Sequence, residues 1–265
     1  TDVTRCIGCE DCVVACQQTN GTGPDAPFRW QYGAASLSST RWTTLSRAPK
    51  GRFVREQCRH CLDPACAAAC PVGALQKSPE GPVIYDANIC MGCRYCMMAC
   101  PFGMTRYEWE SANPRVRKCI MCYDKVVSGE LREPACTSAC PNQATIFGER
   151  ELLLAEARHR IAQKPDLYID HVWGEHEVGG TSVLYVSDVD LGTAGWPVGL
   201  DPHPRPELAR RVLHTVPWTF AGVAVAMVGI QWVARRRQDV AAAEAPQPEE
   251  PSRRDDAGTG TGEKQ

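Results

Sequence analysis

The longest apolar stretch of the chain lies near its C-terminal end, where the twenty residues Thr215–Ala234 carry no formal charge. Twenty helical residues are about 30 Å long, which is the thickness of the hydrocarbon layer of a bilayer. Trp218 and Trp232 stand near the two ends, where aromatic residues meet the membrane interface. Because Arg235–Arg237 and a polar tail follow at once, the pattern predicts a single transmembrane helix rather than a buried core helix.

Small residues at close spacing within this stretch, Gly222, Ala226 and Gly229, suit packing against a second transmembrane helix. A single span with this spacing therefore predicts a membrane partner. Arginines flank both ends, so the count of positive charges is tied, and the three adjacent arginines after the span favour a cytoplasmic tail. They are Arg205, Arg210 and Arg211 before the span and Arg235, Arg236 and Arg237 after it.

Shorter patterns lie before the span. Glu149–Gln163 combines good helix formers with an apolar face and ends before Lys164-Pro165, which predicts a helix. Short apolar stretches bounded by turn residues predict strands at Pro82–Tyr85, Ala144–Phe147 and Thr181–Val186. These patterns divide the chain into a domain over residues 1–190 with an insertion at 17–52, a linker at 191–211, a transmembrane helix at 212–237 and a disordered tail at 238–265.

Composition narrows the class of protein. The chain has 265 residues, 43% of them hydrophobic, and a formal net charge of −2, so nothing indicates a nucleic-acid partner. No nucleophile–base pair, Gly-rich phosphate loop or flavin or nicotinamide fingerprint stands out. We therefore expect no catalytic site in this chain.

The cysteines change the picture most. All sixteen lie before residue 141 and fall into four quartets with none left over. The first and third quartets have the spacing C-x2-C-x2-C-x3-C, in which three thiolates grip one face of an iron–sulfur cubane while the fourth reaches elsewhere. The quartets are Cys6, Cys9, Cys12, Cys16; Cys58, Cys61, Cys66, Cys70; Cys90, Cys93, Cys96, Cys100; and Cys119, Cys122, Cys136, Cys140. This count predicts four [4Fe–4S] clusters and hence electron transfer.

Paired cysteines also form disulfides and zinc sites in other proteins. Disulfide frameworks do not need repeated C-x2-C spacing, and a chain of this length does not depend on them. Zinc modules also use C-x2-C pairs, but they usually set two such pairs at a distance instead of stringing three thiols together. A zinc-binding, membrane-anchored structural module is the alternative from a different class of protein.

The quartets belong to an internal repeat of cysteine run, turn and short strand. Proline follows the last cysteine of three quartets, at Pro71, Pro101 and Pro141, whereas Gln17 takes that place in the first. Proline ends a helix, so the backbone turns away from the cluster there. The fold class expected from this repeat is α+β, with tandem bacterial-ferredoxin-like units around four clusters and one C-terminal transmembrane helix.

Basic side chains beside the cysteines could raise cluster potentials, since charge, hydrogen bonds to sulfur and solvent exposure set those potentials. The alternative is that they are ordinary solvated side chains. The candidates are Arg59, His60, Arg94, Lys118 and Lys125. His60 as a Rieske-type ligand is disfavoured because its quartet is already complete. Core packing is the expected role of Met91, Met97, Met98 and Met121.

The order and spacing of the four quartets resemble those of the four-cluster ferredoxin-like β subunits of membrane oxidoreductases. This superfamily includes the iron–sulfur subunits of formate dehydrogenase, dimethyl sulfoxide reductase and hydrogenase-2. The segments Phe147–Leu152 and Gly174–Thr181, with the single C-terminal span, look most similar to the HybA-type subunit of hydrogenase-2. The resemblance covers nearly the whole chain up to residue 237.

The resemblance implies a nested pairing of the quartets, in which each cluster borrows its fourth ligand from another quartet. One cluster would take Cys6, Cys9, Cys12 and Cys140, and its neighbour Cys119, Cys122, Cys136 and Cys16. The inner pair would take Cys58, Cys61, Cys66 with Cys100, and Cys90, Cys93, Cys96 with Cys70. Such an exchange ties distant segments of the chain together.

The family also implies a function and a location. It implies an electron-transfer subunit between a catalytic subunit, most similar to that of a NiFe hydrogenase, and a multi-span quinone-reactive membrane subunit. A formate dehydrogenase or another molybdopterin enzyme is the alternative catalytic partner. Relatives of this type are single-pass proteins of the cytoplasmic membrane with the cluster domain in the periplasm, which agrees with the three arginines after the span.

Overall fold

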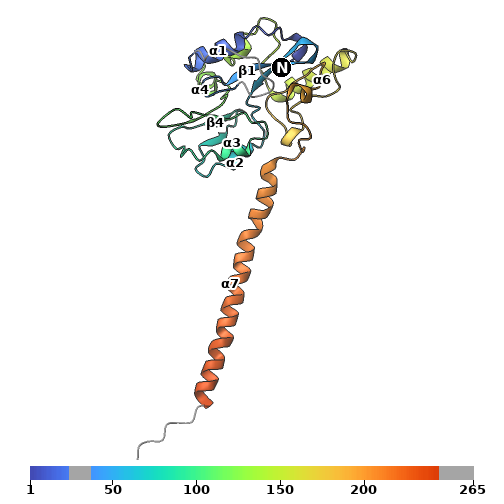
Figure 1. Ribbon diagram of the computed structural model, residues 1–265. Helices are drawn as coiled ribbons and strands as arrows, with labels where there is room; N and C mark the ends of the chain where they lie inside the picture. The colour runs from blue at the N-terminus through green and yellow to red at the C-terminus, as the bar shows by residue number, and fades with distance from the viewer. Residues whose placement is uncertain (24–36, 245–265) are drawn as a thin grey trace, which may run out of the picture. The chain divides into compact units, whose positions relative to one another are not determined.

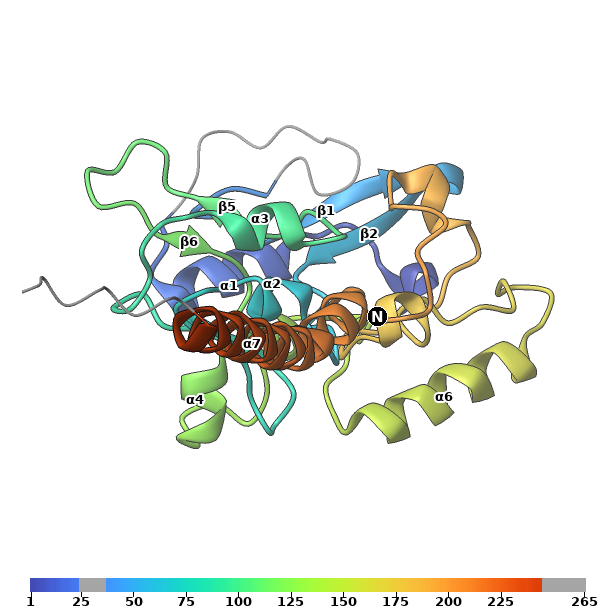
Figure 2. The same cartoon turned by 90° about the horizontal axis from the view of Figure 1, so that it is seen from below.

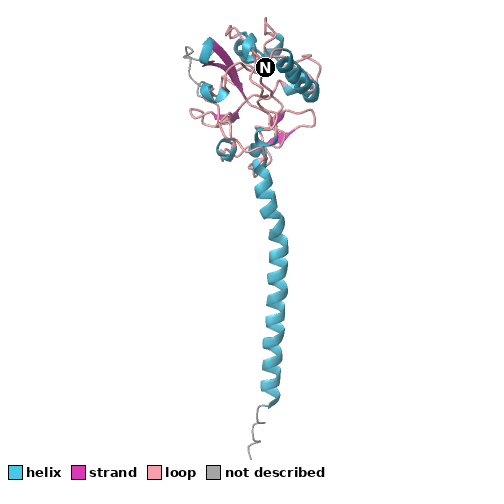
Figure 3. Cartoon of the chain, turned by 90° about the vertical axis from the view of Figure 1, so that its right-hand side faces the viewer, coloured by secondary structure: helices cyan, strands magenta, loops and turns pink. Residues whose placement is uncertain are grey.

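The structure is a computed structural model that describes residues 1–23 and 37–244. It comprises two units, of which unit 1 is Thr1–Arg210 and unit 2 begins at Arg211. Most of unit 1 is loop between short helices and small strands, as Figure 3 shows. Cysteine runs rich in Gly and Pro interrupt regular structure, so few stretches are long enough for an extended helix or sheet.

Six helices and three antiparallel strand pairs make up the regular part of unit 1 as described (Figure 1). The helices are α1 (Asp11–Asn20), α2 (Ala65–Ala68), α3 (Tyr95–Ala99), α4 (Tyr123–Val127), α5 (Ala135–Ser138) and α6 (Arg150–Gln163). The strands are β1 (Thr43–Ala48), β2 (Arg52–Gln57), β3 (Leu75–Lys77), β4 (Val83–Tyr85), β5 (Arg106–Tyr107) and β6 (Val116–Arg117). The predicted strand at Pro82–Tyr85 is therefore present as β4.

A hairpin, β1–β2, begins in the segment predicted as an insertion, 17–52, and continues past its end to Gln57. Its register runs from Thr43 opposite Gln57 to Ala48 opposite Arg52. Helix α1 packs against β1. Gly8 has a positive φ, and a Cβ there would lie 2.8 Å from the ring of Phe53, so only glycine lets the first cysteine run approach β2 this closely. The remainder of the insertion, at residues 24–36, lies outside the described residues.

The other strand pairs lie at the opposite end of unit 1. In Figure 1, α1, α4 and β1 lie together at one end of this unit, and α2, α3 and β4 at the other. Helices α2 and α3 pack against each other. The amide of Val116 in β6 donates to the hydroxyl of Tyr85 in β4 at 3.3 Å, which joins two of the strand pairs.

Helix α6 confirms the predicted helix almost to the residue. Leu154, Ala157 and Ile161 recur at helical spacing on its buried face and pack against Val172, Leu184 and Val186. Figure 2 shows this helix at the side of unit 1, away from α1 to α3. Its first residue, Arg150, donates to the backbone oxygen of Thr181 at 2.8 Å, so the segments Phe147–Leu152 and Gly174–Thr181 contact each other.

Two predicted strands are wrong. Ala144–Phe147 is not a strand, although the oxygen of Ala144 accepts a hydrogen bond from the amide of Asp2 at 2.6 Å. Thr181–Val186 makes only isolated bridges, to Cys61, Trp173 and Asp2 in turn. Each stretch has the right residues, but no single neighbouring strand runs beside it long enough to form a ladder.

Helix α7 (Arg205–Glu244) begins at the end of unit 1 and continues into unit 2. It is longer than the predicted transmembrane helix at 212–237. It is the one helix among the described residues that is long and apolar enough to cross a membrane. The predicted linker 191–211 contains a short turn of helix at Leu191–Ala194, and its last residues already belong to α7. Residues 238–244 are helical where disorder was predicted, and the rest of the predicted tail, 245–265, lies outside the described residues.

Candidate metal centres

The cysteine runs share one local structure. The third cysteine of each run lies in the first turn of a short helix. In the first three runs the two preceding ligands sit in the loop before that helix, whereas in the fourth run α4 lies between Cys122 and α5. These four residues, all buried, are Cys12 in α1, Cys66 in α2, Cys96 in α3 and Cys136 in α5. The thiols are therefore placed by backbone geometry and not by side-chain flexibility.

In each run, the residue just before the second cysteine has a left-handed backbone. The φ values are +75° at Gly8, +51° at His60, +72° at Gly92 and +59° at Met121. Two of these positions carry side chains, for which this conformation costs about 1–3 kcal/mol. All four runs form a tight loop that turns its thiols inward, and this loop accounts for the shared left-handed residue.

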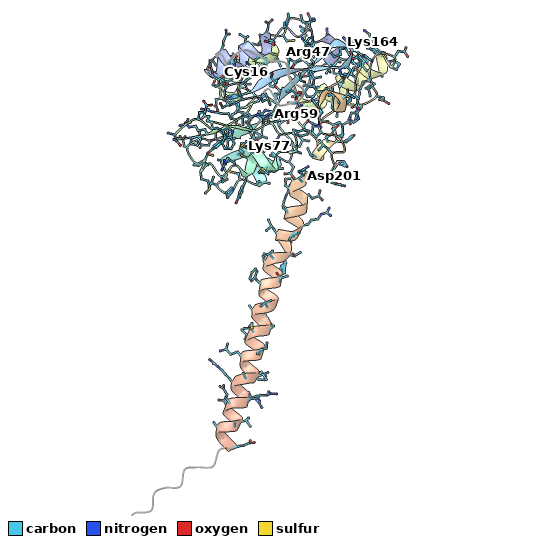
Figure 4. All side chains as sticks on the ribbon, viewed as in Figure 1. Cys16, Arg47, Arg59, Lys77, Lys164 and Asp201 are labelled. Carbon is cyan, nitrogen blue, oxygen red and sulfur yellow. The ribbon has the colours of Figure 1, made fainter. Side chains whose placement is uncertain are left out.

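The thiols gather in four sets, each with three members from one run and the fourth from another run. Sets A and B line cavities, of about 30 Å³ for set A and about 210 Å³ for set B. Set A is Cys6, Cys9, Cys12 and Cys140, and set B is Cys119, Cys122, Cys136 and Cys16. Figure 4 labels Cys16, which comes from α1 although its set-mates follow residue 118.

Electrostatic neighbours define the other two sets. Burial raises the pKa of the Cys61 thiol first, and the charges of Cys58, Cys100 and Cys66 raise it further. Burial likewise raises the pKa of Cys96 to about 11, with Cys90, Cys70 and Cys93 as the next contributors. Set C is thus Cys58, Cys61, Cys66 and Cys100, and set D is Cys90, Cys93, Cys96 and Cys70.

Clusters of packed buried side chains join neighbouring sets and place them in a line. Cys12 of set A packs in one cluster with Cys136 of set B, Cys119 of set B shares a second with Cys58 of set C, and Cys66 of set C shares a third with Cys96 of set D. Burial raises the pKa of Cys12 in set A to about 12, and Cys136 of set B adds to the increase. Burial and then Cys136 raise the pKa of Cys119 in set B to about 12, and Cys58 of set C follows. Cys66 of set C lies near Cys96 of set D in the same way. The order along the unit is therefore A, B, C, D.

The fourth cysteine of every run accepts a hydrogen bond from the residue four positions later. In the three Cys-Pro runs the donor is a backbone amide, because the chain leaves the helix at the proline. The amides of Ala74, Met104 and Ala144 donate to the Sγ of Cys70, Cys100 and Cys140 at 3.2, 3.4 and 3.2 Å. Such bonds are among the features that tune iron–sulfur potentials.

The first run achieves the same contact by different means. Gln17 replaces proline, so α1 continues past Cys16 and its amides stay in the helix ladder. The side chain of Asn20 takes over, with Nδ2 at 3.6 Å from the Sγ of Cys16 and 2.8 Å from the Cys16 oxygen. Burial raises the pKa of the Cys122 thiol, and the side chain of Asn20 opposes that rise, so Asn20 lies beside two thiols of set B.

The basic residues singled out from the sequence divide into buried and outer ones. Arg59 is buried, pairs with Glu56 at 2.6 Å and stacks 3.7 Å from the centre of the Trp196 ring. Figure 4 places it near the middle of unit 1. Lys118 is also buried and donates to the oxygen of Cys119 at 3.1 Å. Both are therefore fixed parts of the interior and not solvated side chains.

The outer two have different surroundings. Arg94 lies over the rings of Tyr107 and Trp109 at 5.5 and 5.0 Å. Lys125 pairs with Glu130 at 2.6 Å near the surface. For these two the solvated alternative describes the structure better.

His60 is fully buried, and its Nδ1 accepts a hydrogen bond from the amide of Val83 at 2.8 Å. Burial lowers the pKa of this imidazole well below its usual value, and Lys118 and Lys77 lower it further. The ring is therefore neutral, and the nitrogen that accepts from Val83 is occupied.

The methionines do not share one environment. Met121 packs against the core around Tyr185, and Met97 packs beside set D. In contrast, Met91 and Met98 are 65% and 85% exposed. Core packing is thus the role of the first two only.

A residue that sequence analysis missed is Arg55 on β2. It is buried and lines both the set A cavity and the set B cavity. It stands three residues before the nearest cysteine, in a strand with no cluster signature, so the chain offers no local signal for it. Only the presence of three charged residues, Arg52, Arg55 and Glu56, in one short strand could have raised the question.

The donor chemistry fits iron–sulfur cubanes. Each set offers four free thiols, as four irons of a cubane each need one thiolate. In the described part of the chain, no three His, Cys, Asp or Glu side chains converge closely enough for a single metal ion. Four separate irons do not require that convergence.

Comparison with known proteins gives the same chemistry. The 4Fe-4S dicluster domain matches residues 5–74 and again 50–150. A protein of Nitratidesulfovibrio vulgaris Hildenborough is 39% identical over 256 residues, which cover 92% of this chain and 68% of that protein. The hydrogenase-2 operon protein HybA of Escherichia coli O157:H7 is 36% identical, with 71% of this chain and 69% of that protein covered. The nitrate-inducible formate dehydrogenase iron-sulfur subunit of Escherichia coli K12 is also 36% identical, with 70% and 66% covered.

Proposed function

The chain belongs to the family of HybA-type ferredoxin-like iron–sulfur electron-transfer subunits, and on this premise we propose that it relays electrons through four [4Fe–4S] clusters. In this proposal the chain has no catalytic site of its own. It connects a catalytic subunit, a NiFe hydrogenase in the first place, to a quinone-reactive subunit in the cytoplasmic membrane.

The observation that carries the proposal is the linear order of four complete thiol sets. The sixteen thiols form four groups of four, and shared clusters of buried side chains join each group to the next, with Cys12 beside Cys136, Cys119 beside Cys58 and Cys66 beside Cys96. A line of sites with short steps is the arrangement that an electron relay needs, because electron transfer slows steeply with distance. The proposed ligands are the members of sets A, B, C and D.

Each cluster, when bound, takes up and returns one electron. The protein's part is to hold the thiols, to exclude water and to stabilise negative charge on sulfur. Set B is buried throughout, since Cys16, Cys119, Cys122 and Cys136 are all below the surface. Amide donors to the fourth cysteine of three runs, and Asn20 in the first, stabilise thiolate charge without adding a net charge.

The two ends of the line meet the surface, and we place the redox partners there. In set A, Cys9 is exposed and the neighbouring Ile7 is an exposed apolar side chain. Beside set D, Met91, Tyr95 and Met98 are exposed together around Cys90 and Cys93. Monomeric proteins rarely leave such apolar groups uncovered next to a functional site, so each end is a proposed docking face.

Hydrogenase is preferred to formate dehydrogenase because the segments Phe147–Leu152 and Gly174–Thr181 resemble HybA. Contact between them through Arg150 gives these segments a structural role in unit 1. The choice of partner therefore rests on the family likeness. Identification of the large subunit that copurifies with the tagged chain tests it, with a hydrogenase large subunit expected and a molybdopterin subunit as the contrary result.

Helix α7 supports a membrane anchor, and the three arginines after the span, Arg235–Arg237, favour a cytoplasmic tail and hence a cluster domain in the periplasm. Its apolar side chains are exposed along the span, which suits contact with lipid and with a second helix at Gly222, Ala226 and Gly229. Protease added to intact spheroplasts is expected to digest unit 1. Protection of unit 1 would place it in the cytoplasm.

The cluster count is tested by metal analysis of the full chain purified without oxygen. Sixteen irons and sixteen acid-labile sulfides per chain are expected, because each cubane holds four of each. A brown protein that dithionite bleaches is expected as well. A colourless protein that contains zinc would favour the structural module instead.

A further inference from the structure

Arg55 is a buried cation without a carboxylate partner. Its side chain is on β2, and the residue is 4% exposed. Nη1 donates to Oγ1 of Thr145 at 2.8 Å, and Nη2 donates to Oε1 of Gln57. Nε has no hydrogen-bond partner, and no ion pair of Arg55 with Asp or Glu occurs within residues 1–23 and 37–244.

Other arginines of the same strand region show what is missing. Arg52 binds the carboxylate of Asp188 at 2.9 Å, and Arg59 binds that of Glu56 at 2.6 Å. A guanidinium does not lose its proton in proteins, so Arg55 carries its charge into the interior. An unpaired buried charge is strongly unfavourable, and a stable protein must offset it by other means.

The surroundings supply negative charge in another form. Arg55 lines the cavity of set A and the cavity of set B, and it is the only charged side chain that the two cavity linings, as described, share. The charge of Arg55 acts on thiols of both sets. Burial raises the pKa of Cys12 and of Cys16, and Arg55 opposes that rise at each. Four thiolates around a cubane core carry net negative charge, and each added electron increases it.

We propose that Arg55 is the shared counter-cation of the clusters held by sets A and B, and that it raises the reduction potentials of both. This inference rests on the proposed four-cluster function and deepens it. The guanidinium lies between two neighbouring sites, so it stabilises the extra electron on either one. Thr145 and Gln57 hold the planar group in place from two sides, and Arg55 acts through its charge and not as a ligand.

The test is a redox titration of the full chain in detergent without oxygen, followed by electron paramagnetic resonance. The variants are Arg55→Met, which removes the charge, and Arg55→Lys, which keeps it. Arg47→Met is the matched control, because Arg47 is exposed on the neighbouring strand β1 and water screens its charge. Serine variants of Cys9, Cys122, Cys61 and Cys93 assign the signals to sets A, B, C and D.

Arg55→Met is expected to shift the midpoint potentials of the set A and set B clusters to lower values together. Set C, set D and the Arg47→Met protein are expected to keep wild-type potentials, and Arg55→Lys to lie close to wild type. Unchanged potentials for sets A and B, a shift in only one of them, or equal shifts in all four sets would each overturn the inference.

A second variant and the iron content of the wild-type protein guard the test against a variant that does not fold and against missing clusters. If Arg55→Met does not accumulate, Arg55→Gln, which keeps hydrogen-bonding capacity without charge, is titrated in its place with the same expected shifts. Iron content of the wild type separates the two levels of the proposal. Fewer than four clusters in the wild type would refute the proposed function, whereas four clusters with potentials insensitive to Arg55 would refute this inference alone.

Discussion

Set B, in the middle of the row of four thiol sets, differs from set D at its end. In set B all four cysteines are buried, and a cation, an amide side chain and a short helix from three separate segments surround them. In set D only Cys96 is buried, and Tyr95 and Met98 beside it are 60% and 85% exposed. A buried site must be stabilised from within the chain, whereas an outer site leaves surface for a partner. The difference gives each region its own sensitivity to mutation.

The largest expected effect is loss of a ligand from the middle. Cys136→Ser removes a buried ligand on α5 that touches sets A and B, so iron content is expected to fall well below about three quarters of wild type. Cys93→Ser at the outer set D is expected to retain about three quarters or more, because only one cluster is affected. Iron analysis of both proteins is the measurement. If both variants lost the same amount of iron, the proposed difference between set B and set D would be contradicted.

The second effect concerns buried and outer arginines. Arg59→Met leaves the carboxylate of Glu56, which is fully buried, without its cation and is expected to destabilise the fold by about 3–5 kcal/mol. Arg94→Met at the set D rim loses only aromatic contacts and is expected to cost about 0.5–1 kcal/mol. Thermal unfolding monitored by circular dichroism compares them, and similar melting temperatures would contradict the account.

A smaller effect is expected at Asn20. Asn20→Leu removes the side-chain hydrogen bond to the Sγ of Cys16, so the set B potential is expected to fall by roughly 20–40 mV, the equivalent of about 0.5–1 kcal/mol. Iron content is expected to stay unchanged. Gln18→Leu is the control, because Gln18 is exposed on the same helix. A redox titration in which both variants behave alike would show that the Asn20 contact has no influence.

The smallest effect on stability is expected at the outer surface. Met98→Ser is expected to change the free energy of unfolding by less than about 0.5 kcal/mol, since the side chain makes few contacts. Recovery of the partner complex is expected to drop nonetheless. Leu152→Ser on α6, which is similarly exposed, is the control and is expected to leave recovery unchanged. If Met98→Ser left the complex intact, the docking face proposed beside set D would be wrong.

Sequence patterns predicted local structure well where one segment determines it. The helix at Arg150–Gln163 needs only its own apolar spacing, and it was predicted almost to the residue. The strand predicted at Thr181–Val186 failed because strands need a continuous neighbour, and its residues meet three different ones. The hairpin β1–β2 was not foreseen, since its strands bury polar and apolar residues at consecutive positions and so lack the alternation that indicates a strand.

The metal centres show the same division. Spacing within a run predicts three ligands that share one side of a cluster, but it cannot tell which distant cysteine completes the set. That pairing came from a family resemblance, and the use of the sixteen thiols as iron ligands stays a prediction. Arg55 and Asn20 were beyond the reach of spacing, because their roles depend on where β2 and α1 meet thiols from other segments.

The central claim is that four clusters lie in a line in the order A, B, C, D. A cryo-electron microscopy map of the full chain, purified without oxygen in complex with its partners, tests it directly. The account predicts four cubane densities, with the second held by Cys119, Cys122, Cys136 and Cys16 and located between the clusters of sets A and C. Fewer than four cubanes, or a cluster whose four ligands all come from one run, would contradict it.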